Sequence, residues 1–381
     1  MNNFVFYNPT RLIFGKGSIS KISGEIPRDK KVLLTFGGGS VKSNDVYNQV
    51  RYALKDHSCT EFWGIEPNPT IQTIRKAVEL LKREKSDFIL AVGGGSVLDA
   101  TKLISAAGMY IGDPWDLVLH PALYKESVPY GTVITLPATG SEMNKGAVIS
   151  NRDTHEKFSF YSTYPKFSVL DPVTTSSLPP YQIACGLADT FIHVIEQYLT
   201  KTGESPLMDR WAEGILSTIV EIAPKIREGE RSYEYMATFM LSATMALNGF
   251  ISMGVSQDWA THLIGHELTA LKGITHGHTL AIILPGTMWV LRHEKMEKIL
   301  QYGKRIWNIE DRDNEKAAGM IIQKTADFFT SLGLKIRLSE NGVDRETIRV
   351  IKERFRKRDY HLGENRSVDA EITEQILNYV Y

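Results

Sequence analysis

The chain has 381 residues, 43% of them hydrophobic and 23% charged, which is typical of a globular protein large enough for two domains. Its 44 basic residues balance its 44 acidic residues, so the composition gives no basic surface for nucleic acid or for an anionic membrane. No stretch approaches 18 consecutive apolar residues and no export signal is recognisable, so we expect small-molecule partners, with no nucleic acid and no membrane.

Cysteine usage indicates the compartment. The chain has only two cysteines, Cys59 and Cys185, which are far apart in the sequence and lie in no CxxC pattern. This pattern argues against a disulfide framework and against a zinc site built from thiolates. A reducing environment fits best, and we expect a cytoplasmic protein.

The first part of the chain alternates between strand-like and helix-like segments. Residues 30–42 (KKVLLTFGGGSVK) and 86–102 (SDFILAVGGGSVLDATK) each run from an apolar strand into three glycines and a serine. Between them, residues 71–85 place apolar side chains on one helical face, as a crossover between parallel strands would. Further strands are predicted within 131–142 and 167–172. We therefore predict a layered α/β domain with a mostly parallel sheet.

The second part of the chain has a different pattern. A turn-rich stretch at 171–182 contains three prolines, and long helical patterns follow it to the C-terminus. We expect Pro224 and Pro285 to punctuate these helices. The predicted domains are an α/β dinucleotide-binding domain over 1–178 and an all-helical domain over 179–381.

The two glycine runs are candidates for phosphate binding. Consecutive glycines after a buried strand let the backbone approach a phosphate, and the N–H groups of the next helix favour its charge. Residues 93–96 are the stronger candidate, because a clean apolar strand precedes them and a plausible helix follows. Ordinary tight turns would look the same. At the other run, an acidic residue that would bind an adenosine ribose is replaced by Gly39, with Ser40 and Lys42 nearby, which favours NADP over NAD.

Histidines and one aspartate form a candidate metal site. Asp189 and His193 are four residues apart in a helical pattern within an apolar run, so both side chains leave the same face. A second pair, His262 and His266, has the same spacing on a helix expected from about 258 to 271. One carboxylate with neutral imidazoles suits zinc or ferrous iron better than calcium or magnesium.

The turn after this second helix adds two more histidines. We expect Gly273 to end the helix, His276 to lie in a turn before an apolar segment, and His278 to follow. Spacing alone does not rank the four histidines between 262 and 278 as ligands, and hydrogen-bonded structural histidines remain the alternative for each.

At this point the chain resembles the iron-activated, group III, alcohol dehydrogenase family, and within it most closely the NADPH-dependent butanol dehydrogenases and broad-range aldehyde reductases. The resemblance covers essentially the whole length. The matching segments are NPTRLIFGKGSI (8–19), GIEPNPTIQT (64–73), AVGGGSVLDATK (91–102), TLPATGSEMN (135–144), KFSVLDP (166–172), DTFIHVIEQY (189–198), QDWATHLIGHELTA (257–270) and THGHTLAIILP (275–285).

The resemblance implies a role for each matching residue. The metal ligands would be Asp189, His193, His262 and His276. His266 would face the reaction centre and pass protons, whereas His278 matches no family histidine. The cofactor would be contacted by Gly38, Gly39, Ser40, Asn68, Gly94, Gly95, Ser96, Asp99, Thr135, Thr139, Ser141 and Lys157.

The resemblance also implies the fold and the reaction. The fold would be a dehydroquinate synthase-like, group III alcohol dehydrogenase fold, with an α/β dinucleotide-binding domain and an all-α metal-binding domain. The reaction would be hydride transfer between NADP(H) and a small aldehyde or primary alcohol, assisted by one zinc or iron ion. A homodimer joined through the N-terminal strand region is also implied. The alternatives are a dehydroquinate synthase-like lyase acting on a phosphorylated sugar acid, and a non-catalytic nucleotide- or metal-binding protein.

Overall fold

The computed structural model describes all 381 residues and contains two compact units. We call residues Tyr7–Pro179 with Arg231–Thr244 the sheet unit, and residues Met1–Phe6, Pro180–Glu230 and Met245–Tyr381 the helical unit. The expected boundary near residue 178 lies where the chain passes from one unit to the other. Two segments cross the expected ranges, because residues 1–6 pack with helices and residues 231–244 pack with the sheet unit. The ranges 1–178 and 179–381 therefore remain a proposal.

A six-stranded parallel sheet forms the centre of the sheet unit. Its strand order is β1-β8-β5-β4-β2-β3, and every neighbouring pair is parallel. The strands are β1 (Arg11–Phe14), β2 (Lys31–Phe36), β3 (Ser58–Phe62), β4 (Phe88–Gly94), β5 (Tyr130–Leu136) and β8 (Phe167–Leu170). The predicted parallel α/β architecture is thereby confirmed.

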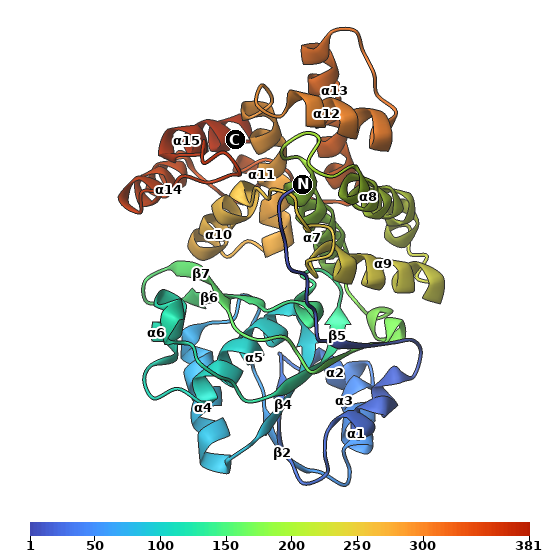
Figure 1. The fold of residues 1–381 in the computed structure, drawn as a ribbon, viewed down its shortest axis with the longest axis vertical. Helices are drawn as coiled ribbons and strands as arrows, with labels where there is room; N and C mark the ends of the chain where they lie inside the picture. The colour runs from blue at the N-terminus through green and yellow to red at the C-terminus, as the bar shows by residue number, and fades with distance from the viewer. The chain divides into compact units, whose positions relative to one another are not determined.

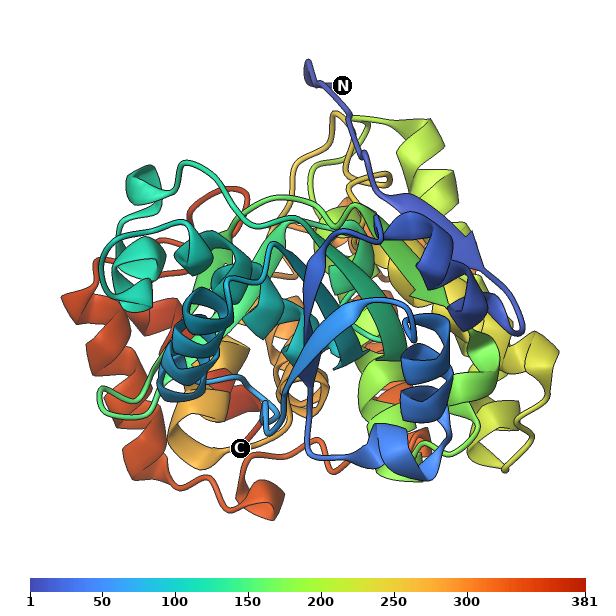
Figure 2. The same cartoon turned by 90° about the horizontal axis from the view of Figure 1, so that it is seen from below.

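Helices cover both faces of this sheet, α4 and α5 on one face and α1 and α3 on the other (Figures 1 and 2). Alternation along the strands explains the two layers: Leu33 packs with the first pair of helices, whereas Val32 and Leu34 pack with the second. The helices of this unit are α1 (Ile22–Glu25), α2 (Ser40–Ser43), α3 (Val46–Ala53), α4 (Ile71–Glu84), α5 (Gly95–Gly108), α6 (Pro114–Leu119) and α9 (Tyr233–Ala246).

A two-stranded antiparallel sheet is present that was not predicted from the sequence. Strands β6 (Gly146–Asn151) and β7 (Glu156–Tyr161) pair as a hairpin, and β6 alternates between buried and half-buried residues. The segment GAVISN carries that alternation in its sequence, but its small residues give a weak signal. The hairpin matters because Lys157, a predicted cofactor contact, lies on β7.

The helical unit contains no strand, as predicted for the C-terminal part of the chain. Its helices are α7 (Pro180–Tyr198), α8 (Pro206–Arg227), α10 (Ala260–Lys272), α11 (His276–Val290), α12 (Met296–Tyr302), α13 (Asn314–Ser331), α14 (Arg345–Lys357) and α15 (Ala370–Tyr379). None of the helices in the structure combines the length and the apolarity that a membrane span requires.

Pro224 and Pro285 were expected to interrupt the helical pattern, but both lie inside helices. Pro224 lies in the last turn of α8, and Pro285 lies within α11. An internal proline costs a helix about 3 kcal/mol. In α11 the residues around Pro285 are almost all buried, so packing of the helix outweighs this local cost.

Candidate functional site

Helix α7 places two predicted metal ligands in the core of the helical unit. Every residue from Ile183 to Tyr198 is buried, including Asp189 (2% exposed) and His193 (3% exposed). Their four-residue spacing puts both side chains on one face of the helix, with His193 Nδ1 3.8 Å from Asp189 Oδ1. A carboxylate this deeply buried needs a partner of opposite charge.

The start of α11 brings His276 beside that carboxylate. His276 was predicted to lie in a turn, and this prediction was wrong by one residue. His276 is the first residue of α11, and Thr275 is the residue that precedes the helix. A Cβ at Gly277 would lie 2.2 Å from the carbonyl oxygen of Cys185, so only glycine lets α11 approach α7 this closely. This approach leaves His276 Nε2 3.9 Å from Asp189 Oδ1.

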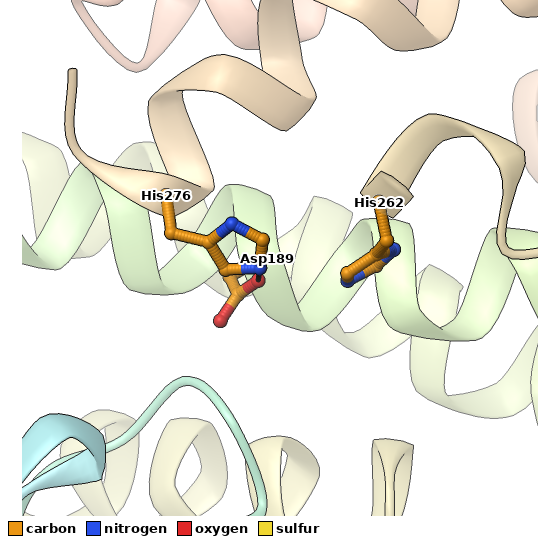
Figure 3. A group of neighbouring side chains, drawn as sticks. All are labelled: Asp189, His262 and His276. Carbon is orange, nitrogen blue, oxygen red and sulfur yellow. Dashed lines mark ion pairs between the residues drawn. The ribbon is translucent and has the colours of Figure 1, made fainter. Parts of the chain in front are cut away.

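Helix α10 supplies His262 to the same place. It runs from Ala260 to Lys272 and ends at Gly273 with φ 70°, as predicted. The ligand atoms of Asp189, His262 and His276 all lie within 4.8 Å of one another (Figure 3). The His193 ring also packs on the His262 ring, with centroids 4.6 Å apart. All four residues that the resemblance assigns to the metal are therefore neighbours.

The chemistry of these side chains fits a divalent cation. His193 Nδ1 and His262 Nε2 are both buried without a hydrogen-bond partner, which is costly unless an ion uses their lone pairs. Burial, reinforced by the neighbouring His262, holds the pKa of His193 well below its ordinary value, so this imidazole is neutral, as a ligand must be. One carboxylate and three imidazoles suit zinc or ferrous iron.

Glu196 also belongs to this cluster, although it was not predicted from the sequence. Its carboxylate is 3% exposed and accepts hydrogen bonds from the His262 ring Nδ1–H and, at 2.7 Å, from the Thr261 backbone N–H. A proton held on Nδ1 leaves the lone pair of Nε2 for a metal. Glu196 lies three residues after His193, and that helical spacing was the available signal.

The two remaining histidines of the segment have different surroundings. The ring of His266 is buried and lies 5.1 Å from the ring of His276, centroid to centroid. His278 is fully engaged elsewhere, since its Nδ1 bonds to Tyr181 Oη at 3.0 Å and its Nε2 to the Lys335 carbonyl at 2.8 Å. Because both of its ring nitrogens are hydrogen-bonded, His278 has a structural role.

A buried charge cluster anchors the chain just before α10. Lys295 Nζ lies 2.7 Å from Asp258 Oδ2 and 2.6 Å from Glu364 Oε1, and all three side chains are at most 6% exposed. Burial, followed by the neighbouring Asp258, raises the pKa of Glu364 to about 7, whereas Lys295 helps to hold the pKa of Asp258 low. The single charge of Lys295 thus faces two carboxyl groups, and Glu364 loses its proton only at a higher pH than Asp258.

This cluster predicts a pH dependence of stability. Between the ordinary pKa of 4.5 and about 7, folded Glu364 binds a proton that the unfolded chain has lost, so its contribution to the free energy of unfolding falls as pH rises. Relative to Glu364→Gln, the wild-type free energy of unfolding should fall by about 2 kcal/mol between pH 5 and pH 8. Urea unfolding of both proteins at fixed ionic strength measures this, and a pH-independent difference would contradict it.

Both glycine runs lie at the topological switch point of the sheet unit. β2 continues outward to β3, β4 continues to β5 on the other side, and β2 and β4 are neighbours. In doubly wound sheets, ligands bind beyond the carboxyl ends of the strands at such a point. Residues 37–40 follow β2, and residues 94–96 lead from β4 directly into the N-terminus of α5.

The two glycine loops differ in how closely other atoms approach their backbone. An added Cβ at Gly38 or Gly39 would meet no atom within 4 Å, and Gly39 has φ 112°, so this loop presents open backbone. At Gly95 a Cβ would lie 2.5 Å from Thr139 Oγ1, which puts two predicted cofactor residues in contact. Thr135, another predicted contact, is 6% exposed on β5.

Other predicted cofactor residues form two hydrogen-bonded groups. Lys157 Nζ donates to Asn68 Oδ1 at 2.9 Å, and the Asn68 N–H donates to Ser96 Oγ at 3.3 Å. Separately, Ser141 Oγ donates to Asp99 Oδ1 at 2.7 Å. Predicted contacts from distant parts of the chain thus converge beside residues 94–99.

A buried lysine stabilises the second of these groups. Lys102 Nζ lies 2.7 Å from Ser141 Oγ and donates to the Gly146 carbonyl at 2.6 Å. Asp99 uses its second oxygen to accept the Val148 N–H at 3.0 Å. Burial raises the pKa of Asp99 and lowers the pKa of Lys102 to about 8. This network fixes the start of α5 against β6.

Two family models and one relative decide the classification. Residues 9–172 match the model described as "Iron-containing alcohol dehydrogenase", and residues 183–381 match "Fe-containing alcohol dehydrogenase family, C-terminal". The chain is 46% identical over 382 residues to the NADPH-dependent aldehyde reductase YqhD of Escherichia coli K12, covering 99% of both proteins. The chain belongs to the iron-containing alcohol dehydrogenase family.

Solved structures of family members have the same fold. Escherichia coli K-12 YqhD superposes with a TM-score of 0.98 at 45% identity, covering 100% of this chain and 99% of that one. NADH-dependent butanol dehydrogenase A of Thermotoga maritima superposes with a TM-score of 0.94 at 35% identity, covering 100% and 99%. The family and fold indicated by the sequence motifs are confirmed, and this iron-containing alcohol dehydrogenase is an oxidoreductase.

Proposed function

We propose that the protein interconverts small aldehydes and primary alcohols with NADP(H), using one zinc or iron ion held by Asp189, His193, His262 and His276. The observation that carries the proposal is the convergence of one carboxylate and three imidazoles, buried except for half-buried His276, in a chain of this family. The alternatives of a lyase and a non-catalytic binding protein gain no support from the relatives, which are named as aldehyde reductases and butanol dehydrogenases.

Each group of residues has a part in the proposed reaction. A bound divalent ion supplies polarisation of the substrate oxygen, and a bound nicotinamide supplies or accepts the hydride. Glu196 holds His262 in the tautomer that leaves Nε2 available. His266, buried beside His276, would pass a proton between the substrate oxygen and solvent.

The cofactor would lie along the two glycine loops of the sheet unit. The backbone of Gly38 and Gly39, with the Ser40 hydroxyl, would hold the adenosine phosphate. The pyrophosphate and the nicotinamide ribose would contact Gly94, Gly95, Ser96 and Asp99, and a second strip of contacts would come from Thr135, Thr139 and Ser141. Asn68 would border the adenine, and Lys157 would lie near the ribose.

Lys42 supports a preference for NADP(H) over NAD(H). Its Nζ lies 4.1 Å from the centre of the Trp63 ring, and Trp63 stacks on Phe36 at the end of β2 with centroids 4.1 Å apart. The stack holds an ammonium group close to residues 37–40, none of which carries a carboxylate, and the nearby Glu61 carboxylate accepts from Trp63 Nε1 at 2.8 Å. Named relatives use either cofactor, NADPH in YqhD and NADH in the Thermotoga enzyme, so this preference belongs to the proposal.

Removing this ammonium group should weaken the preference. In Lys42→Met, kcat/KM for NADPH should fall about tenfold while kcat/KM for NADH stays within about twofold, because only the 2′-phosphate loses a charge partner. Lys55→Met is the matched control, since Lys55 also lies over a ring, that of Tyr52 at 5.1 Å. Equal losses with both cofactors would assign Lys42 to general packing instead.

The proposed activity has a direct test. NADPH absorbance should fall on addition of butyraldehyde, more slowly with NADH, and not at all after the protein is treated with a chelator. Added zinc or ferrous ion should restore the rate. If several small aldehydes, each with zinc and with iron, cause no loss of absorbance, the proposed function is wrong.

We also propose a cytoplasmic homodimer joined through the N-terminal strand region. β1 is an edge strand of the sheet, and Tyr7 and Phe14 beside and within it are 72% and 36% exposed. An exposed edge with apolar side chains is normally covered in solution. Both cysteines are free, as expected in a reducing compartment.

A further inference from the structure

A second polar site lies in the helical unit, in a pocket between α8, α12 and the π-helix Gly303–Trp307 that follows α12. The pocket has a volume of about 840 Å³. Its lining is polar and basic, consisting of Arg210, Glu213, Gly214, Ser217, Gln301, Lys304, Arg305 and Asn308. None of these residues belongs to the metal cluster or to the predicted cofactor contacts, so the proposed function leaves the pocket unexplained.

One buried carboxylate positions two guanidinium groups in this pocket. Glu213, whose side chain is 7% exposed, accepts from Arg305 Nη1 at 2.6 Å and from Arg210 Nη1 at 3.0 Å. Neither guanidinium makes another hydrogen bond or ion pair, so the other N–H groups of both arginines remain available. Glu213 is itself held, because it accepts from Tyr198 Oη at 2.8 Å.

The backbone that carries Arg305 is fixed by packing. A Cβ at Gly303 would lie 2.1 Å from Ile321 Cδ1, so the π-helix rests directly on α13. Asn308 ends the π-helix in the left-handed conformation, with φ 55°. π-Helical turns are uncommon and occur often at functional sites. The backbone that carries Arg305 is thus held in place by α13, whereas Arg210 reaches the pocket from α8.

Charge and shape together define the ligand. Three cations and one carboxylate line the pocket, and the only partner of Lys304 is Glu310 at 3.1 Å, in a solvent-exposed pair that contributes little. Forked guanidinium groups match phosphate oxygens, and the pocket, which is open to solvent, has room for a small organic molecule. We infer that the pocket binds a small phosphate-bearing metabolite through Arg210 and Arg305.

Binding should be measured with NADP⁺ present at saturation, so that phosphate does not occupy the cofactor loops. Calorimetry with inorganic phosphate and with glycerol 3-phosphate should show one saturable site with a dissociation constant below about 1 mM. Tighter binding of the ester would identify an organic phosphate as the ligand, and equal binding would identify the phosphate group alone as the recognised chemistry. Both results support the site.

Variants connect the binding to this pocket. Arg210→Gln should weaken binding about threefold to tenfold, and Arg210→Gln with Arg305→Gln at least about tenfold. Arg210→Gln alone is included because the Arg210 side chain is 63% exposed, so its replacement should leave the fold intact. The control Arg349→Gln with Arg356→Gln removes two exposed guanidinium groups of α14 and should change nothing. A dissociation constant above about 1 mM for both ligands, or equal losses in the control, would overturn the inference.

Discussion

Replacing His262 with alanine should abolish tight metal binding and lower kcat/KM for aldehyde reduction by about a thousandfold or more. The His262 ligand atom lies within 4.8 Å of those of Asp189 and His276, so its loss leaves an open and incomplete site. Elemental analysis after dialysis, together with NADPH-linked kinetics, measures both effects. The variant also leaves Glu196 buried without its histidine, so its fold should be compared with metal-free wild type by circular dichroism.

A histidine remote from the cluster provides the control for this variant. His361 is 43% exposed and lies 3.5 Å from Asp359 on the surface, so His361→Ala should keep full metal content and activity. If His262→Ala retained one equivalent of metal and the wild-type rate, His262 would leave the proposed ligand set. Loss of activity with full metal content would instead give His262 a role in binding substrate.

The second large effect is expected at Glu196. In Glu196→Gln, an amide NH₂ replaces one of the two carboxylate oxygens, which accept separately from the His262 Nδ1–H and the Thr261 N–H, so that NH₂ must face one of these donors. The histidine can then move its proton to Nε2, where it blocks the metal. We expect metal affinity to fall by about 10-fold to 100-fold, measured by competition with a chromogenic chelator.

The histidine itself reports the same effect. In ¹⁵N-labelled metal-free protein, His262 should carry its proton on Nδ1 in the wild type and on Nε2 in Glu196→Gln. Glu221→Gln, which changes an exposed carboxylate on α8, serves as the control and should leave affinity and tautomer unchanged. A loss of affinity without a change of tautomer would mean that Glu196 acts through its charge alone.

Much of the architecture could be predicted from the sequence because the relevant signals are local. The strands around residues 31–36 and 88–94 are apolar runs that end in glycines, and the crossover helix shows its buried face as a regular spacing. Gly273 marks a helix end by its own conformational freedom. Such features need no information about distant residues.

The features that could not be predicted depend on contacts between distant segments. Gly277 fixes His276 at the start of a helix only because the carbonyl of Cys185 lies against it. Glu196 looks like one more helical glutamate until α10 is packed on α7. Likewise, the spacing of His262 and His266 is the same as that of Asp189 and His193, and the resemblance, not the spacing, separated them. The assignment of the site residues therefore remains a prediction.

The near-complete burial of α7 also has a consequence for how the enzyme acquires its metal. From Ile183 to Tyr198 every residue of this helix is buried, and its own apolar side chains, such as Phe191 and Ile192, are packed fully into the core. Two of the four proposed ligands are therefore placed by packing before any ion arrives, unlike those of a zinc finger, which needs its metal to fold. We therefore expect that the metal can be removed and replaced without unfolding, so that the ion bound in a cell would follow the local supply of the element.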